Sequence, residues 1–171
     1  MCMKNLNATI ITCADVPSNK DEHGLITYKG VFDFIVPQKH TDGDTLCIDA
    51  FDVIINMSAI FDGNQKQENN CIGKEVQKDE EYICALCANS DESSEMITLG
   101  VFPFKAAHTK PIMNNRSFFD ATFKLRTKPF DVSANTPQLD LMLLIKNNQQ
   151  PDGKWTVQTI KRLFINRKAD T

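Results

Sequence analysis

The feature that most constrains the fold is an alternation of apolar and other residues between positions 139 and 166. In its first half, every second position is a branched aliphatic residue: Leu139, Leu141, Leu143 and Ile145. In its second half, one face is expected to carry Trp155, Val157, Leu163 and Ile165. A period of two is typical of a β-strand, and Pro151-Asp152-Gly153 favours a chain reversal. The pattern predicts a closing β-hairpin over 139–166, which needs a second layer because an isolated hairpin is only marginally stable.

Similar patterns predict further strands along the chain. They cover Leu6–Val16, Leu25–Val36, Thr45–Phe61, Tyr82–Ala88, Met96–Phe104 and Ser117–Arg126. Gly30 interrupts the apolar row of the second strand, which predicts a bulge or a close backbone approach. The run Thr45–Phe61 is either one long strand or two with a bend near Asp49. It is expected to place on one face Cys47, Phe51, Val53, Ile55, Met57, Ala59 and Phe61.

Polar segments separate these strands. Asp62–Glu81 is predicted to be a long, mobile loop, Ser90–Glu95 a hairpin turn, and Lys105–Arg116 and Ser133–Pro137 irregular loops. No segment is strongly helical. With 171 residues, the chain is long enough for one domain with a sizeable core. We therefore predict a single all-β domain over 1–171, built as an antiparallel two-layer β-sandwich of about seven or eight strands, immunoglobulin- or C2-like, with long polar loops.

Composition limits the classes of function. The formal net charge of -3 argues against nonspecific nucleic-acid binding, and no segment reaches the apolar length of a membrane span. Met1–Asn7 has no apolar signal region, so a cytoplasmic location is expected. In that reducing compartment the six cysteines are expected to be free thiols, mostly small buried hydrophobes, and no cofactor is predicted.

One CxxC motif, Cys84 to Cys87, raises the question of a metal. Cys71 and His108, in predicted loops, are the residues that could complete a site. Because Cys84 and Cys87 lie three apart in a predicted strand, their side chains are expected on opposite faces, which favours two structural cysteines. The sequence contains no nucleophile elbow, phosphate loop or HExxH motif. A Cys71–His108 pair is the remaining enzyme hypothesis.

The chain contains eleven phenylalanines, and most of them occupy alternating positions that indicate core filling. Phe118 beside Phe119, and Phe164 beside Ile165, place large apolar groups on both faces of a strand. One of the two faces must then be covered by another element or by another subunit, so a partner or dimer contact is predicted.

Two groups of motifs carry a resemblance. An opening strand that ends in Cys13-Ala14-Asp15, followed by Gly30-Val31-Phe32-Asp33-Phe34-Ile35, and a Leu-rich strand paired with a final strand, resemble a group of small bacterial proteins of unknown function. The resemblance covers the two ends of the chain. It implies a β-sandwich and brings no catalytic residues with it.

The function predicted from these features is a non-enzymatic intracellular protein-binding module of bacterial or phage origin, which acts through loops or a strand edge. The residues expected to bind the partner are Asn64, Lys66, Glu68, Lys124, Arg126 and Lys128. Two alternatives stay open. One is a structural subunit of a phage or bacterial assembly, which would form homo-oligomers. The other is a metal-binding sensor or hydrolase that uses Cys71, Cys84, Cys87 and His108.

Overall fold

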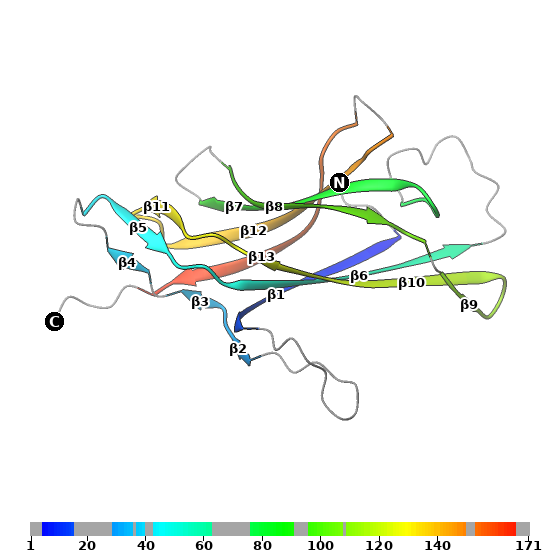
Figure 1. Ribbon diagram of the computed structural model, residues 1–171, viewed down its shortest axis with the longest axis horizontal. Coiled ribbons are helices and arrows are strands. Elements are labelled where there is room, and N and C mark those ends of the chain that lie inside the picture. The colour runs from blue at the N-terminus through cyan, green and yellow to red at the C-terminus, as the bar shows by residue number, and fades with distance from the viewer. Residues whose placement is uncertain are drawn as a thin grey trace.

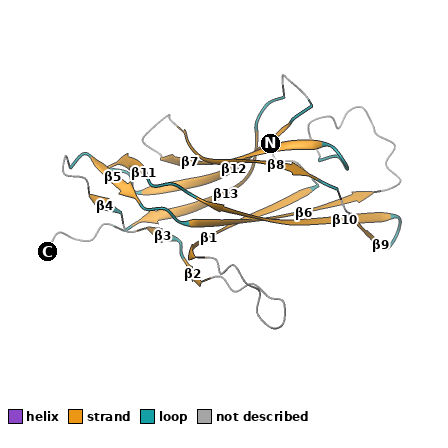
Figure 2. Ribbon diagram, viewed as in Figure 1, coloured by secondary structure: helices purple, strands orange, loops and turns teal. Residues whose placement is uncertain are grey.

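The computed structural model describes residues 5–15, 29–35, 37–39, 43–62, 76–90, 96–107, 109–149 and 153–166. These ranges form an all-β structure of thirteen strands (Figure 1), which confirms the predicted fold class at that level. Figure 2 shows strands and loops in them but no helix. The described ranges hence hold no helix of the length and apolarity that a membrane crossing needs.

The strands form two five-stranded sheets and one three-stranded sheet. Sheet A has the order β2-β1-β6-β10-β9, with β1 at Leu6–Asp15, β2 at Lys29–Val31, β6 at Asp52–Asp62, β9 at Lys110–Ile112 and β10 at Arg116–Arg126. Sheet B has the order β3-β13-β12-β7-β8, with β3 at Phe34–Ile35, β7 at Glu81–Ser90, β8 at Met96–Lys105, β12 at Gln138–Asn147 and β13 at Thr156–Ile165. Sheet C has the order β11-β5-β4, with β4 at Gln38–Lys39, β5 at Thr45–Ile48 and β11 at Phe130–Ser133. Of the described strand pairs, β3 with β13 is parallel and the others are antiparallel.

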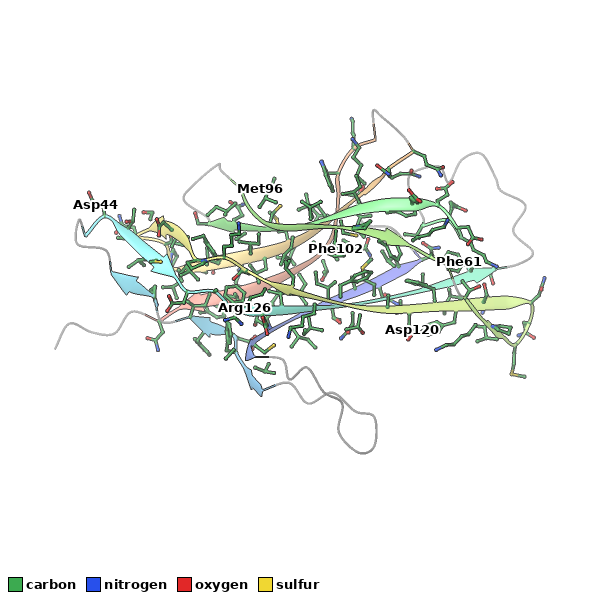
Figure 3. All side chains as sticks on the ribbon, in the orientation of Figure 1. Asp44, Phe61, Met96, Phe102, Asp120 and Arg126 are labelled. Carbon is green, nitrogen blue, oxygen red and sulfur yellow. The ribbon has the colours of Figure 1, made fainter. Side chains whose placement is uncertain are left out.

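Sheets A and B share one apolar core. Their strands alternate, so that every second side chain of β6 and β12 faces inward; the inward side chains include Val53, Ile55, Met57, Leu139, Leu141, Leu143 and Ile145. Figure 3 shows Phe102 between the two layers. Its ring centroid lies 4.7 Å from that of Phe123, and the ring centroids of Phe104 and Phe119 are 5.2 Å apart. These aromatic contacts join β8 to β10, and thus sheet B to sheet A.

A corner connects sheet A to sheet C. Residues 49–51 divide β5 from β6, and residues 127–129 divide β10 from β11 opposite them. Two hydrogen bonds bridge the interruption: the Thr127 amide donates to the Phe51 carbonyl (2.9 Å), and the Phe51 amide donates to Thr127 Oγ1 (3.0 Å). Pairing resumes with Ile48 opposite Phe130. The chain therefore bends at residues 49–51 and, opposite them, at residues 127–129. The first bend confirms the two-strand interpretation of Thr45–Phe61.

The corner also changes which side chains face the core. In β6 the odd-numbered residues Val53 and Ile55 are in the core, whereas in β5 the even-numbered residues Leu46 and Ile48 are. The prediction that Cys47 shares a face with Val53 is therefore wrong, and Cys47 is half-buried on the other side of β5. The corner also divides the predicted run Thr45–Phe61 into two strands, which adds one strand to the predicted seven or eight.

The closing hairpin is confirmed as β12 and β13, but its second arm contains a β-bulge. Leu143 lies opposite Thr159 while Leu144 lies opposite Val157, so Gln158 is the extra residue. The prediction of one continuous apolar face is wrong for Val157, which packs with Leu144 and Ala85 on the outer side of sheet B. The bulged Gln158 instead donates its side-chain amide to the Leu6 carbonyl on β1. Pro151 and Asp152 of the predicted turn lie outside the described residues.

Residues 29–35 and 37–39 form three short strands, so the prediction of one strand over Leu25–Val36 is wrong for the part that is described. β2 pairs with β1, β3 with β13, and β4 with β5, so this segment joins all three sheets. Gly30 has a φ of 63°, and a Cβ placed on it would be 3.1 Å from the Cβ of Ala14. The predicted close backbone approach is therefore confirmed.

The predicted loop at Asp62–Glu81 is partly ordered structure. Residues 63–75 lie outside the description, but 76–80 are anchored, and Val76 is part of the core. The Asn5 side chain donates to the Val76 carbonyl and accepts from the Val76 amide, both at 2.8 Å. The Tyr82 hydroxyl accepts from the Gln77 amide (2.8 Å) and donates to Glu80 (3.0 Å). Residues 76–80 are therefore a loop, as predicted, and these contacts anchor it to the core.

Further element boundaries differ from prediction. Pro103 lies inside β8 and does not end the strand, because β8 is the edge of sheet B and one side of an edge strand needs no amide donor. The predicted loop Lys105–Arg116 contains β9, which pairs with the start of β10. Phe130–Ser133, for which no strand is predicted, is β11.

The corner makes a prediction about Thr127. Thr127→Val keeps the shape of this buried side chain but leaves the Phe51 amide without its acceptor. We expect the free energy of unfolding to fall by about 1–3 kcal/mol, as measured by urea denaturation. Thr122→Val is the matched control, because the Thr122 hydroxyl bonds Asn56 at the exposed surface and its loss should cost about 0.5 kcal/mol or less. Equal losses in the two variants would contradict the role of the corner.

Gly30 allows a second prediction. Both Gly30 and Gly43 have positive φ, but a Cβ on Gly43 would meet no atom within 4 Å. Gly30→Ala and Gly43→Ala should each lower the free energy of unfolding by about 1 kcal/mol, the cost of a left-handed backbone with a side chain. Gly30→Ala should cost more than Gly43→Ala because its methyl group also contacts Ala14. Equal costs in thermal unfolding would show that the approach to Ala14 has no energetic consequence.

Candidate protein-binding surface

Two of the basic residues predicted to bind a partner, Lys124 and Arg126, lie on the outer face of sheet A. In β10, Phe123 and Leu125 point inward, so Lys124 and Arg126 point outward. Asp52, the first residue of β6, lies opposite Arg126. Its carboxylate is 3.2 Å from the Arg126 guanidinium and 3.5 Å from Lys124 Nζ. The structure thus brings Lys124 and Arg126 together on one carboxylate.

Burial of Asp52 explains why the two cations are held there. The Asp52 residue is 1% exposed, and a carboxylate removed from water needs charged or hydrogen-bonding partners. The side chains of Lys124 and Arg126 remain 46% and 59% exposed. Lys128 follows the end of β10 and is also exposed. Two cations share the one buried carboxylate of Asp52, which leaves this part of the face positive.

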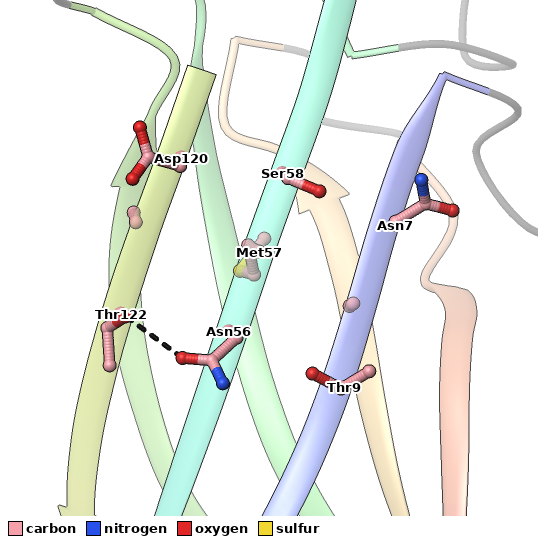
Figure 4. A pocket seen from close by; sticks show the side chains of 9 residues that line it. Asn7, Thr9, Asn56, Met57, Ser58, Asp120 and Thr122 are labelled. Atoms are coloured by element: carbon pink, nitrogen blue, oxygen red, sulfur yellow. Dashed lines mark hydrogen bonds between the residues drawn. The ribbon is translucent and has the colours of Figure 1, made fainter. Parts of the chain in front are cut away.

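A polar groove of ≈ 280 Å³ lies farther along the same face. It runs over β1, β6 and β10 and is lined by Asn7, Ala8, Thr9, Asn56, Met57, Ser58, Asp120, Ala121 and Thr122. Figure 4 shows the amide and hydroxyl groups of Asn7, Thr9, Asn56 and Ser58 along its length. The strand register produces this row, because Asn7, Ser58 and Asp120 are opposite one another, as are Thr9, Asn56 and Thr122.

The groove offers hydrogen bonds more than charge. The Thr122 hydroxyl donates to Asn56 Oδ1 at 2.9 Å (Figure 4), which fixes both side chains. Of the nine lining residues, Asp120 alone is ionisable, and it is paired with Lys110 at 3.3 Å. Amides and hydroxyls both donate and accept, so this row can hydrogen-bond an extended polypeptide or a polar side chain.

The remaining predicted binding residues, Asn64, Lys66 and Glu68, lie outside the described part of the chain. The residues that sequence reasoning missed are Asp52 and the polar row of the groove. Asp52 had one available signal, because it is an acidic residue at the start of a strongly apolar strand and is therefore in need of a partner. Nothing in the sequence pairs it with residues more than seventy positions away.

The structure separates the two cysteines of the CxxC motif, as predicted. Cys84 belongs to the core between the sheets, whereas Cys87 packs with Ala85 and Leu144 on the outer side of sheet B. Burial raises the pKa of the Cys84 thiol to about 12, which opposes the thiolate that a metal requires. No group of three potential ligands is found among the described residues, while Cys71 and His108 lie outside them. A metal site with those two residues stays a prediction.

No protein-family model, curated protein or solved structure matches the chain. The resemblance to small bacterial proteins therefore stays a prediction, and the function has to be argued from the surface itself.

The Asp52 cluster makes a prediction about stability. Lys124→Met and Arg126→Met should each cost about 1 kcal/mol of unfolding free energy, because the other cation still pairs with Asp52. The double variant should lose about 3 kcal/mol, more than the sum, because the buried carboxylate then lacks both cations. Each loss would be measured by urea denaturation. Lys128→Met is the control: Lys128 lies outside the cluster, so its replacement should change the free energy of unfolding by about 0.5 kcal/mol or less. Additive losses would contradict this account.

Proposed function

We propose that this chain is a β-sandwich of the immunoglobulin or C2 type that works inside the cell as a protein-binding module, without catalytic activity of its own. Two five-stranded sheets around a shared core support the sandwich assignment. Bacterial or phage origin belongs to the same proposal and rests on the sequence resemblance. The partner is proposed to present an acidic surface to Lys124, Arg126 and Lys128.

The observation that carries the proposal is the anchoring of two cations on a buried carboxylate. Long basic side chains normally lose conformational entropy when they bind, which weakens the contact. Lys124 and Arg126 have lost part of that freedom already, since Asp52 holds them at 3.5 Å and 3.2 Å while about half of each side chain stays exposed. An acidic partner surface would meet charges that are already in place.

The groove beside the cluster extends the same surface. Its amides and hydroxyls supply the neutral hydrogen bonds that accompany charge pairs in protein interfaces. Asp120 and Lys110 at its far end are already paired with each other, so the net positive charge is confined to the Asp52 end. The surface therefore favours a partner whose acidic part lies beside a polar, neutral part.

We expect charge reversal at Lys128 to weaken this binding. The experiment retains partners from a lysate of the source cells under reducing conditions. It compares the wild-type protein, Lys128→Glu and the control Lys154→Glu. Lys154 is also exposed but lies outside this surface, at the start of the β13 arm. The retained protein would then be purified and its affinity measured by calorimetry. The affinity of Lys128→Glu should be at least tenfold weaker than that of the wild type, whereas the affinity of Lys154→Glu should be within about twofold of it. Binding to the wild type should also weaken at higher salt.

Three results would count against the proposal: no protein retained by the wild type, equal losses in Lys128→Glu and Lys154→Glu, or retention of nucleic acid in place of protein. Lys128 makes a suitable test position because its replacement leaves the Asp52 cluster intact, so a lost interaction would not be confused with a lost fold.

A second candidate function, a structural subunit of an assembly, is favoured by a different observation. Several large apolar side chains on the outer side of sheet B are exposed. Subunits of assemblies bury such surfaces in contacts between chains. The two functions are compatible, because they use opposite faces of the molecule.

A further inference from the structure

The outer side of sheet B is rich in exposed apolar side chains. Its exposed members, between 46% and 64% accessible, are Phe34, Met96, Val101, Ile160 and Phe164. Figure 3 shows Met96 and Asp120 on opposite sides of the molecule, with the core residue Phe102 between them. Cys87, Ala85 and Leu144 form the buried floor beneath the exposed side chains. We call this set of eight residues the apolar face.

The strand register places the apolar face in rows, with one row of mostly polar residues between them: Arg162, Asp140, Asn89 and Met96. Val157, Leu144, Ala85 and Val101 lie side by side across β13, β12, β7 and β8. The next row consists of Ile160, Met142, Cys87 and Thr98. At the edge with β3, Phe34 lies opposite Phe164, with ring centroids 5.8 Å apart. The exposed side chains therefore belong to one surface and are not scattered.

The charged groups in the middle of this face already neutralise each other. The Arg162 guanidinium donates to both carboxylate oxygens of Asp140, at 2.8 and 2.9 Å. This double hydrogen bond holds the pKa of the Asp140 carboxyl below its usual value. A partner that covers the pair has no need to supply a charge there. The face thus fits an occupant that is itself apolar and without net charge.

We propose that the occupant is the apolar face of a second copy of this chain, in a dimer with two-fold symmetry. Around a two-fold axis a surface meets itself, so a face with net charge would repel its copy, while a neutral apolar face does not. The outer side of sheet A is less suited to this contact, because it carries the exposed Lys124 and Arg126 and the polar groove, which would lose their water. The dimer does not depend on the proposed binding of an acidic partner, since that uses the opposite sheet. It rests on the same side of sheet B as the second candidate function and specifies its contact.

The dimensions of the face suffice for a dimer. Four strands spaced about 4.8 Å apart and four rows at about 6.7 Å per residue pair cover about 500 Å². Two copies would bury about 1,000 Å² in total, which is the lower limit for a specific interface between proteins. An interface at that lower limit is typical of weak or transient contacts, so the dimer should dissociate on dilution.

The test is the mass of the full chain in solution, measured by sedimentation equilibrium under reducing conditions at about 1–100 µM. The wild type should approach twice its 19.3 kDa as the concentration rises. Ile160→Lys should raise the dimer dissociation constant at least about 100-fold, because each copy would bury an unpaired ammonium. Ile60→Lys is the matched control: Ile60 is similarly exposed, at 49% against 55%, but lies on the outer side of sheet A, and its replacement should leave the dimer unchanged.

Circular dichroism would show whether each variant folds. If Ile160→Lys does not, Val101→Lys and Phe34→Lys make the same test at more exposed positions of the face. A wild type that stays monomeric up to about 100 µM would overturn the proposal. So would a dimer that survives these substitutions, or one that Ile60→Lys disrupts equally. A monomer that binds phosphatidylcholine vesicles, and loses that binding in Ile160→Lys, would replace the second copy by a lipid surface.

Discussion

The pair of hydrogen bonds between Phe51 and Thr127 is the constraint on which the arrangement of the sheets depends. It holds β6 and β10 together where both leave sheet A, so that their continuations, β5 and β11, pair again in sheet C. Phe51 is buried beside Phe32 and Phe130 at this point, and the backbone polar groups of the corner must be satisfied internally because water is excluded. Asp52 follows directly, so the corner also decides where the buried carboxylate and its two cations lie.

The two outer faces differ because their strands carry different residues at the positions that point away from the core. On sheet A these positions include a row of amides and hydroxyls and several ion pairs, and on sheet B they include more aliphatic, aromatic and thiol groups. The same alternation fills the shared core from both sides. A chain with one polar and one apolar outer face can bind two different partners at once, and the proposed acidic partner and second copy would not compete for the same surface.

The alternation of apolar and polar residues predicted those parts of the fold in which it continues unbroken over many residues. The alternation in β10 and β12 and the apolar run of β6 gave the strands, the inward residues and the closing hairpin. The prediction failed where a tertiary contact interrupts the alternation. At the corner, the even-numbered residues of β5 face the core in place of the odd-numbered ones. At the Gln158 bulge, Val157 is turned to the outer side of sheet B. The basic residues of the surface were recognisable, but Asp52 and the polar row were not, because strand register brings them together from distant parts of the chain.

The joining of three sheets by residues 29–39 has a consequence for synthesis on the ribosome. β2 can pair with β1 early, but β3 has to wait for β13, which follows some 130 residues later. At about 5–20 residues per second, that interval lasts on the order of ten seconds. During this time Phe34 and its neighbours are unpaired on the nascent chain, and the order in which the sheets close is set by translation as well as by their stability.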